Sequence, residues 1–375
     1  MVSTKIGDIF KSKAQTLVNT VNCVGVMGKG IALGFKKQFP DMHDDYVARC
    51  KGGHMKLGEP YLYRRSPPPW ILNFPTKDHW RSVSRLSDIV RGLEYLLQHY
   101  KEWGITSLAV PPLGCGQGQL EWKVVGPTLY RYLSRLDVPV EMYAPHGTPE
   151  QQIRISFLAQ EAKHLADLVG KPQTSKIDPA WVALVQILDR IYHEPYHWPV
   201  GRTSLQKLAY FATEAGLPTG LHFSRGSYGP YASALKPIVT KLVNNGLLEE
   251  KKLGRMFAVA PGPTYRDAAK TFQGELEKWD QIIERVSDLL LRMRTEQAEA
   301  AATAHFAAQT LERMGQKEPS ETDVLAEVKR WKQRRRPALE DPQAASAIRN
   351  LNLLGWINVR PAEELPVPEE SGADA

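Results

Sequence analysis

Residues 16–39 read TLVNTVNCVGVMGKGIALGFKKQF, and this stretch decides the fold of the amino-terminal part of the chain. Its first seven residues are β-branched or apolar with two asparagines, which is typical of a buried strand. A glycine-rich loop follows at 25–30, and apolar spacing predicts a helix over 31–39 that Pro40 stops. Strand, glycine loop and helix in this order indicate an α/β sheet.

The same pattern returns further along. SLAV (107–110) predicts a strand, PPLGCGQG (111–118) a second glycine-rich loop, and 121–136 a helix. We expect further strands at 60–64, 70–74 and 140–143, and helices at 41–49 and from Val83 to Leu97, ended by Gly104. Two glycine loops therefore follow two strands of one sheet.

Beyond residue 150 the sequence is mainly helical, with helices expected at 179–192, 203–215 and 273–314. Residues 236–259 predict a helix, an Asn-Asn-Gly turn and a short hairpin, an arrangement that a winged helix would produce. We therefore expect an α/β domain over 1–150, a linker over 151–178, a mainly helical domain with winged-helix-like features over 179–360, and a disordered acidic tail over 361–375.

Composition narrows the class of protein. The 375 residues carry a net charge of +7, which is compatible with nucleic acid without indicating it. Three cysteines with no CxxC or histidine spacing argue against a disulfide framework and against zinc. The start MVSTKIGDIF lacks the apolar stretch of a signal sequence. We expect a soluble cytoplasmic protein without metal, cofactor or membrane contact.

Neither glycine loop matches a standard nucleotide motif. Lys29 is followed by Gly30, so the first loop fails the phosphate-binding GxxxxGK[ST] pattern, and Leu33 replaces the third glycine of GxGxxG. Two such loops at the carboxyl ends of strands could instead hold the two phosphates of a diphosphate from opposite sides. Each loop taken alone is as well explained as a simple turn.

Polar residues around the loops suit ribose hydroxyls and a base: Asn19, Asn22, Asp8 and Lys77. Asp8 could equally be a turn or cap residue, and a lone lysine is usually a solvated surface cation. The stretch His79, Trp80, Arg81 with Arg85 places a stackable ring among cations and predicts a path for single-stranded DNA. A tryptophan packed on the sheet beside solvated arginines explains it equally well.

Several of these segments together resemble a known family. NTVNCVGVMGKGIALGFKKQFP (19–40), NFPTKDHWR (73–81) and VPPLGCGQGQLEW (110–122), with GDI at 7–9, resemble the macrodomain of the DarG antitoxins. LQKLAYFATEAG (205–216) and GSYGPYASAL (226–235) resemble their carboxyl-terminal region and the wider Panacea-type antitoxin domains. The resemblance implies a three-layer α/β macrodomain, a mixed sheet between helices.

The resemblance also implies an activity and a partner. DarT toxins transfer ADP-ribose from NAD onto a base of single-stranded DNA, and DarG proteins remove it and bind the toxin. Asp8 and Ile9 would meet the adenine and Asn22 the distal ribose. Lys77 falls on the family's catalytic lysine. The full set implied to bind ADP-ribose is Asp8, Ile9, Asn19, Asn22, Met27, Gly28, Lys29, Gly30, Ile31, Pro112, Leu113, Gly114, Cys115, Gly116, Gln117, Gly118 and Tyr143.

Two departures bear on the chemistry. Related glycohydrolases that pair the lysine with an aspartate carry that acid in the second loop, where this chain has Gly118. Glu121 stands where DarG proteins usually have aspartate. With His79, Trp80 and Arg81, Glu121 is a candidate for DNA contact or acid–base chemistry.

Two other readings stay open at this point. The amino-terminal domain could bind ADP-ribose without cleaving any bond, although a protein that only binds ADP-ribose has no need of a lysine at the distal ribose. The second domain could be a DNA-binding transcriptional autoregulator, using the winged-helix-like region and a basic run that is otherwise an ordinary solvated helix face. That run consists of Lys329, Arg330, Lys332, Arg334, Arg335 and Arg336.

Overall fold

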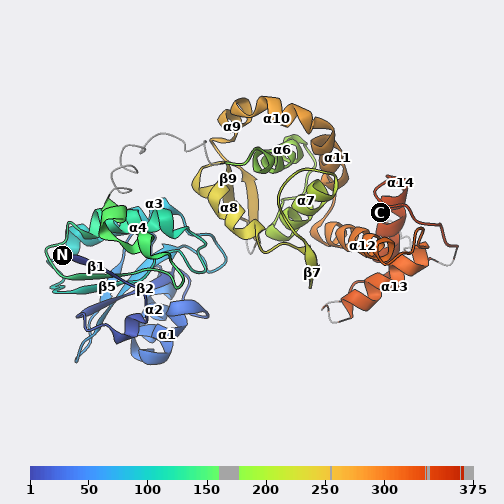
Figure 1. The fold of residues 1–375 in the computed structure, drawn as a ribbon. Helices are drawn as coiled ribbons and strands as arrows, with labels where there is room; N and C mark the ends of the chain where they lie inside the picture. Colours follow the sequence, from blue (N-terminus) through green and yellow to red (C-terminus); the bar gives the residue numbers. More distant parts are fainter. Residues whose placement is uncertain (160–176, 254–255, 334, 336–337, 364, 367–375) are drawn as a thin grey trace. The chain divides into compact units, whose positions relative to one another are not determined.

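The computed structural model describes residues 1–159, 177–253, 256–333, 335, 338–363 and 365–366 (Figure 1). The chain divides into two compact units. The first unit is Met1–Gln173 with Val239–Asn245, and the second is Thr174–Ile238 with Gly246–Ala375. Each unit is described by itself.

The first unit is built on a six-stranded sheet with the strand order β1-β6-β5-β2-β4-β3. Every neighbouring pair is parallel except β3 with β4, which is antiparallel, so the sheet is mixed as expected. The strands are β1 (Val2–Lys5), β2 (Thr16–Asn22), β3 (Tyr61–Tyr63), β4 (Trp70–Lys77), β5 (Leu108–Val110) and β6 (Val140–Tyr143).

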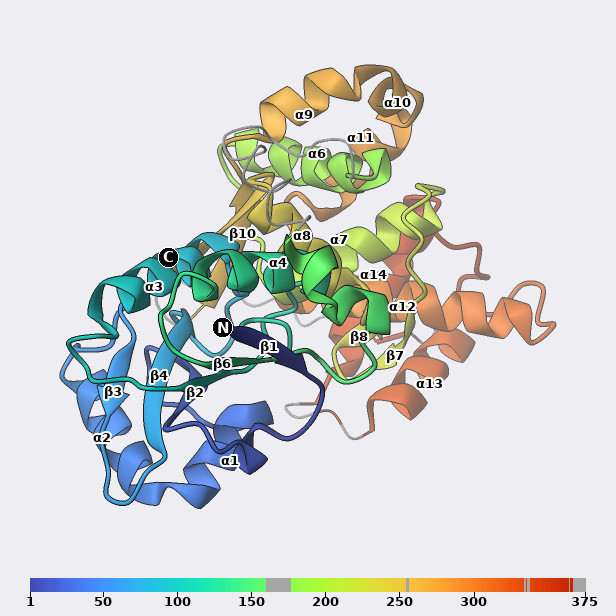
Figure 2. The ribbon, with the colours of Figure 1, turned by 60° about the vertical axis from the view of Figure 1, so that its left-hand side comes forward.

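Helices cover both faces of this sheet, which makes three layers (Figures 1 and 2). Alternate residues of β2 enter different cores, as the two-residue period of a strand requires: Leu17 and Val21 pack on one face and Val18 on the other. One face carries α1 (Gly30–Gln38) and α2 (Pro40–Lys51), and the other carries α3 (Leu86–His99) and α4 (Trp122–Leu133).

Most elements expected in this unit are present within a few residues, with two differences. The sequence did not indicate β1, a four-residue edge strand whose alternate residues are exposed. Pro40 ends α1 but is also the first residue of α2, where a missing N–H costs nothing. Asp41 therefore lies in the first turn of α2.

The first unit continues past residue 150, where we expected the linker to begin. A short 3-10 helix, η2 (Glu150–Ile153), and a helical segment at 155–159 follow β6. Another 3-10 helix, η1 (Ile9–Lys11), follows β1. Thr4 Oγ1 donates to the carbonyl of Ile153 at 2.6 Å, and Leu158 is fully buried in the core. The rest of the predicted linker lies mostly outside the described residues.

The second unit is mainly helical. Its hairpins are β7 (Ser224–Gly226) with β8 (Gly229–Tyr231), and β9 (Leu248–Leu253) with β10 (Met256–Pro261). Its helices are α6 (Pro179–His193), α7 (Arg202–Glu214), α8 (Leu235–Asn244), at whose Val239 the division between the units falls, α9 (Tyr265–Thr271), α10 (Gln273–Lys278), α11 (Asp280–Leu290), α12 (Thr295–Arg313), α13 (Glu321–Lys332) and α14 (Asp341–Leu353).

Three details of this unit bear on the expectations. The helix expected over 273–314 is divided into α10, α11 and α12, and the first break falls at Trp279. The order α8, β9, β10 matches the helix and hairpin expected over 236–259, while a winged helix stays a prediction. Leu365, within the tail expected to be disordered, is buried and accepts a hydrogen bond from Arg349; residues 364 and 367–375 lie outside the described part.

No helix within the described residues is both long enough and apolar enough to cross a lipid bilayer.

Candidate functional site

The residues singled out from the sequence gather at one edge of the sheet. Because neighbouring strands run parallel, their carboxyl ends meet at the same edge, which is where α/β sheets bind ligands. The first loop (residues 23–29) follows β2, and the second loop (residues 111–121) follows β5. Lys77 ends β4, Tyr143 ends β6, and Asp8 follows β1. Since β2 lies between β4 and β5, the two loops and Lys77 are neighbours.

Asn22 shapes the first loop. Its Nδ2 donates to the carbonyl of Val26 at 2.6 Å, and its Oδ1 accepts from the backbone N–H of Val24 at 3.0 Å. The hydroxyl of Tyr46, on α2, donates to the carbonyl of Asn22 at 2.8 Å. Gly25 turns the loop with φ +80°, close against Cys50. The side chain of Asn22 thus holds the loop in shape, and its contact with a ribose stays a prediction.

The first loop places the start of α1 at the carboxyl edge of the sheet. Gly30 has φ +58°, a conformation that favours glycine, and no side chain caps the helix there. The first N–H groups of a helix have no partner within it, and together with the helix dipole they attract anions. Gly28 and Lys29 are exposed beside them, while Met27 is buried. This is a suitable place for one phosphate.

The second loop is a set of tight backbone turns. The N–H of Cys115 donates to the carbonyl of Pro112 at 3.1 Å, and the N–H of Leu120 donates to that of Gly114 at 3.0 Å. Gly114 has φ +74°. Leu113 and Gly114 are buried, whereas Gly116 and Gln117 are exposed at the apex. A ligand can therefore approach the backbone at 116–117.

Gly118 explains why an acid is absent from this loop. A Cβ on Gly118 would lie 2.2 Å from Ser84 Oγ and 2.4 Å from the carbonyl oxygen of Gly114. Because backbone is one of the obstacles, an aspartate cannot stand here in this loop conformation. Glu121, the other carboxylate considered, is exposed at the start of α4 and makes no side-chain cap hydrogen bond.

Lys77 joins the parts of the site. It lies opposite Asn22 in the register of β2 and β4, next to a β-bulge. Its Nζ donates to the carbonyl of Gln117, in the second loop, at 3.1 Å and to that of Ser82 at 3.2 Å. The ammonium group is therefore held between the end of β4 and the apex of the second loop.

Asn19 lies beneath the site rather than in it. It is fully buried, three residues before the end of β2, and its Nδ2 donates to Oδ1 of Asn73 at 2.9 Å. Its Nδ2 also lies 3.9 Å from Sδ of Met27 in the first loop. The burial follows from the strand, because residue 19 shares the face of Leu17 and Val21 that α1 and α2 cover. Asn19 thus supports the loop from below.

Asp8 and Ile9, expected near the adenine, and Tyr143, expected to contact ADP-ribose, are all engaged within the fold in this conformation. Asp8 caps η1 by accepting the N–H of Phe10 at 3.0 Å, and Ile9 is buried. Tyr143 is buried, and its hydroxyl donates to Glu141 at 3.0 Å. Burial, followed by the neighbouring Glu141 carboxylate, raises the pKa of Tyr143. These groups can border a base, and that role stays a prediction.

Both loops carry a cysteine, and neither thiol is set up as a nucleophile. Burial, with smaller contributions from Cys50 and Asp78, raises the pKa of Cys23 to about 12. Burial alone raises the pKa of Cys115 to about 12. Both thiols are therefore protonated at neutral pH, so neither cysteine is a nucleophile candidate. Within the described residues, His, Cys, Asp and Glu side chains form no group of three that could hold a metal ion.

Sequence reasoning missed the residues that brace the site. Tyr46 reaches Asn22 from α2, Ser84 packs under Gly118, and Asn73 pairs with Asn19. Asn73 did leave a signal, since it is a polar residue within an apolar strand that pairs with β2. Tyr46 and Ser84 left none, because only the folded sheet brings them to the loops.

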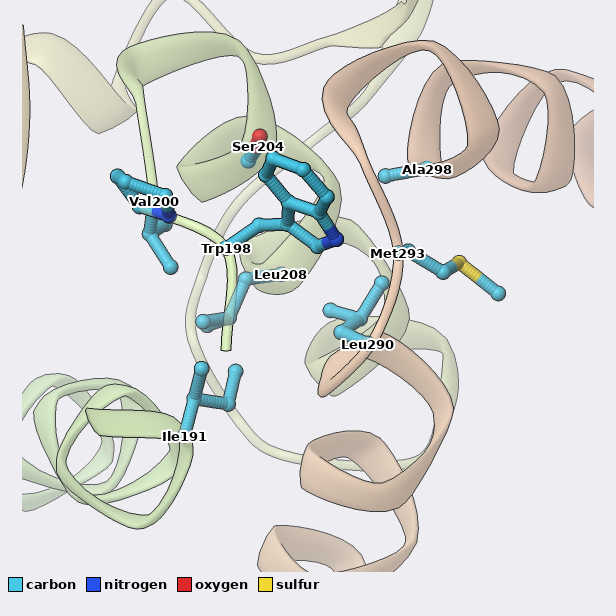
Figure 3. A pocket seen from close by; sticks show the side chains of 9 residues that line it. Ile191, Trp198, Val200, Ser204, Leu208, Leu290, Met293 and Ala298 are labelled. Atoms are coloured by element: carbon cyan, nitrogen blue, oxygen red, sulfur yellow. The ribbon is translucent and has the colours of Figure 1, made fainter. Parts of the chain in front are cut away.

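Among the residues that the structure describes, the second unit holds no comparable arrangement of glycine loops around a lysine. The pocket in Figure 3 has a volume of about 20 Å³, room for one water, and is lined mostly by apolar side chains such as Leu208 and Leu290. A groove of about 450 Å³ is lined by four carboxylates, those of Asp189, Glu194, Glu284 and Asp288, together with Arg190 and His193, and this excess of acids does not suit a diphosphate.

The basic run, which the sequence left open as an ordinary solvated helix face or a DNA-binding surface, is largely paired within its own unit. Lys329 pairs with Asp341 at 2.6 Å, Arg330 pairs with Glu327, and Lys332 and Arg335 both pair with Glu299. Arg334 and Arg336 lie outside the described residues. Internal pairing of these four cations weakens the expectation of a duplex-binding surface.

A mixed sheet between two helical layers, with two glycine loops and a lysine at its carboxyl edge, defines the macrodomain class. A family model described as Macro domain matches residues 18–129. A DNA ADP-ribosyl glycohydrolase of Thermus aquaticus is 35% identical over 306 residues, 80% of this chain and 81% of that protein.

Two further proteins are similar to parts of the chain. A DNA ADP-ribosyl transferase–DNA ADP-ribosyl glycohydrolase fusion protein of Thermosipho africanus is 43% identical over 172 residues, 40% of this chain and 44% of that protein. The solved macrodomain of Thermus aquaticus DarG is 42% identical, covers 39% of this chain and 99% of that chain, and has a TM-score of 0.38. From the similarity to the first relative, the chain belongs to the DarG family of DNA ADP-ribosyl glycohydrolases.

Proposed function

We propose that the first unit hydrolyses the bond between ADP-ribose and a base of single-stranded DNA, and that the second unit neutralises a DarT-type toxin by binding it. The family membership supports the glycohydrolase activity. The residues that perform it, the toxin-binding role of the second unit and the domain boundaries near 150 and 179 are our proposals. We place the protein in the cytoplasm, where its three free thiols are stable.

The observation that carries the proposal is the position of Lys77. Its Nζ lies 3.1 Å from the carbonyl oxygen of Gln117, at the apex of the second loop, and its strand position is opposite Asn22, where the first loop begins. A diphosphate held between the start of α1 and the backbone at 116–117 would direct its distal ribose toward this lysine. ADP-ribose carries such a diphosphate between an adenosine and a distal ribose.

The chemistry follows from the bond to be broken. Cleavage between the anomeric carbon and a base nitrogen develops positive charge on the ribose, while the departing base takes the electron pair and then a proton. Water supplies the new C–O bond and that proton. Fixing the diphosphate and ribose lowers the barrier by orientation, worth potentially several kcal/mol.

Lys77 can contribute in two ways. As a neutral amine it would attack the anomeric carbon and form an adduct that water then hydrolyses. As an ammonium it would donate a proton to the leaving base. An arginine at this position separates the two, because a guanidinium stays protonated and cannot attack.

The partner is inferred from the relative in which transferase and glycohydrolase form one chain. A glycohydrolase that is separate from its transferase would act on that enzyme's product, ADP-ribosylated single-stranded DNA. The second unit has its own apolar core, and its described residues form no loop or lysine arrangement like that of the first, so protein contact is its fitting task. The autoregulator alternative loses support because described cations of its basic run are paired internally.

The enzymatic proposal is tested by incubating the protein with single-stranded oligonucleotides ADP-ribosylated on thymine or on guanine. Chromatography then measures released ADP-ribose and restored base. We expect release from at least one substrate and none when Lys77 is replaced by alanine. Retained ADP-ribose binding without release from either oligonucleotide would identify the first unit as a reader.

The toxin-binding proposal is tested with the full-length Lys77→Ala protein, which separates contact from repair. It is titrated into a purified DarT reaction containing NAD and single-stranded DNA. Stoichiometric suppression of DNA modification is expected. Undiminished modification at excess protein would refute neutralisation by contact.

A further inference from the structure

The turn that follows β4 is fixed to the site at three points. The N–H of Cys23 donates to the carbonyl of Asp78 at 3.0 Å, which ties the turn to the first loop. Lys77 Nζ donates to the carbonyl of Ser82, and the N–H of Ser84 donates to that of Gly118 at 3.4 Å, in the second loop. The turn closes on itself through the N–H of Ser82 and the carbonyl of His79 at 3.0 Å. Its apex, residues 79–81, therefore has a defined place beside Lys77.

The apex carries an exposed aromatic ring. Trp80 is 47% exposed, and among the described residues 1–159 it is the only exposed tyrosine, tryptophan or phenylalanine. The other exposed large apolar side chains on loops at this edge are Ile6, Val24 and Val26. Leaving a tryptophan in water forgoes the free energy of burying it, so a rigid exposed ring beside a site indicates a contact surface.

The ring is already part of a stack. The His79 and Trp80 rings lie 5.5 Å apart with 28° between their planes, and Cζ of Arg81 lies 4.5 Å from the Trp80 ring centroid. The N–H of Arg81 also donates to Nδ1 of His79 at 3.2 Å, which links the outer members. Aromatic rings that stack bases, next to a cation that meets phosphates, are how proteins bind single strands without reading sequence.

We propose that His79, Trp80 and Arg81 form a platform for the DNA nucleotide next to the ADP-ribosylated base. This deepens the proposed function and rests on it. The bond to be cleaved joins the distal ribose to the base, so the modified base lies at Lys77 and its neighbours in the strand must leave past the adjoining turn. The platform selects ADP-ribose attached to a DNA strand over ADP-ribose on a lone nucleoside. It acts on substrate binding and not on the chemical step.

The test compares two substrates that differ only in flanking DNA: an ADP-ribosylated single-stranded oligonucleotide and the matching ADP-ribosylated nucleoside. Trp80→Ala should raise KM for the oligonucleotide about tenfold, the size of effect that loss of one base stack produces, with kcat unchanged. KM for the nucleoside and the affinity for ADP-ribose should stay as in the wild type. Trp80→Phe should restore most of the oligonucleotide KM.

The chain supplies a matched control. Arg64 stacks on Trp70 with Cζ 5.6 Å from the ring, at the amino end of β4, so the same kind of pair stands at the opposite edge of the sheet. Arg64→Ala should leave both substrates unaffected, whereas Arg81→Ala should weaken the salt dependence of the oligonucleotide KM.

Failure of the platform and failure of the proposed function would give different results. If the wild-type protein releases ADP-ribose from neither substrate, the proposed function is wrong. If it cleaves both and Trp80→Ala leaves the oligonucleotide KM unchanged, the platform is wrong and the function stands. An equal loss on both substrates would place Trp80 in the ADP-ribose site itself and also overturn the platform.

Discussion

The cations of the two units donate to backbone carbonyls alike but differ in what else surrounds them. At the sheet edge of the first unit, Lys77 donates to carbonyl oxygens of the turn after β4 and of the second loop. In the second unit, Lys332 and Arg335 surround the carboxylate of Glu299, and Lys207 is buried nearby with its Nζ 2.9 Å from the carbonyl oxygen of Pro230. One arrangement presents a cation beside exposed loops, and the other uses cations to fix a core.

The hairpin β7–β8 shows what the second arrangement does. Lys207 donates to the carbonyl of Pro230, Lys332 to that of Ser227, and Trp331 to that of Gly226 at 3.2 Å. The motifs LQKLAYF and GSYGPY, quoted for their family likeness, thus meet in the fold. Buried ionic groups here position backbone, whereas Lys77 of the first unit is only half-buried and lies beside exposed loops.

The largest expected effect is the loss of activity when Lys77 of the first unit is replaced. Lys77→Ala should lower kcat/KM for ADP-ribosylated single-stranded DNA by about 10³-fold, because proton transfer or attack is lost. ADP-ribose affinity, measured by calorimetry, should change less than about tenfold. Lys13→Ala, an exposed lysine before the amino end of β2, is the control. A rate for Lys77→Ala equal to the wild type would remove this lysine from the mechanism.

In the second unit, removing a charged side chain is expected to lower the stability of the fold and not the activity. Glu299→Ala leaves Lys332 and Arg335 buried without their carboxylate and should cost about 3–5 kcal/mol in the free energy of unfolding of that unit. Glu296→Ala, one turn earlier and exposed, should cost less than about 0.5 kcal/mol. Denaturant titration measures both, and ADP-ribose affinity should be unchanged. Wild-type stability in Glu299→Ala would contradict the contrast.

The two loops are compared through glycines that have room for a side chain. A Cβ on Gly116 meets nothing within 4 Å, one on Gly28 meets only Val26 Cγ1 at 3.9 Å, and neither has positive φ. Gly28→Glu and Gly116→Glu should therefore fold, yet lower ADP-ribose affinity by at least about a hundredfold through steric conflict and charge repulsion. Gly274→Glu, in the second unit and equally open, is the control. Unchanged affinity in both loop variants would place the ligand elsewhere.

The smallest effect concerns pH and Lys207. Burial, followed by repulsion from Lys332, lowers its pKa from 10.5 to about 8. Between pH 8 and 10.5 the unfolded chain holds this proton and the folded unit does not, so stability rises with pH across that window. Relative to Lys207→Met, the wild-type free energy of unfolding should rise by about 1 to 2 kcal/mol from pH 7.5 to 9.5. A flat difference would mean that Lys207 is not desolvated.

Much of the first unit could be predicted from sequence because its signals are local. Strand residues 16–22, the glycine loops and the helix after each are encoded in consecutive residues, and parallel strands then bring Lys77 to both loops. Asn19 shows the limit. Its polarity suggested a ligand contact, yet the two-residue period of β2 turns it toward the face that α1 and α2 cover, where its Nδ2 donates to Oδ1 of Asn73.

The parts that sequence could not supply depend on long-range packing. Tyr46 donates a hydrogen bond to Asn22, which lies 24 residues away in the sequence. Ser84 leaves no room for a Cβ at position 118, so only glycine fits there in this loop conformation. The basic run at 329–336 looked like a solvated or DNA-binding face because its partners are remote, with Glu299 lying 33 residues before Lys332. The role of a run of charged residues can be assigned only when the partners of its side chains are known.

The most direct test of the central claim, that the carboxyl edge of the first unit's sheet holds ADP-ribose, is hydrogen–deuterium exchange of the full chain with and without ADP-ribose. The account predicts slowed exchange in residues 23–32, 78–84 and 112–120 and no change in α6–α14. Unchanged loops, or protection confined to the second unit, would contradict it.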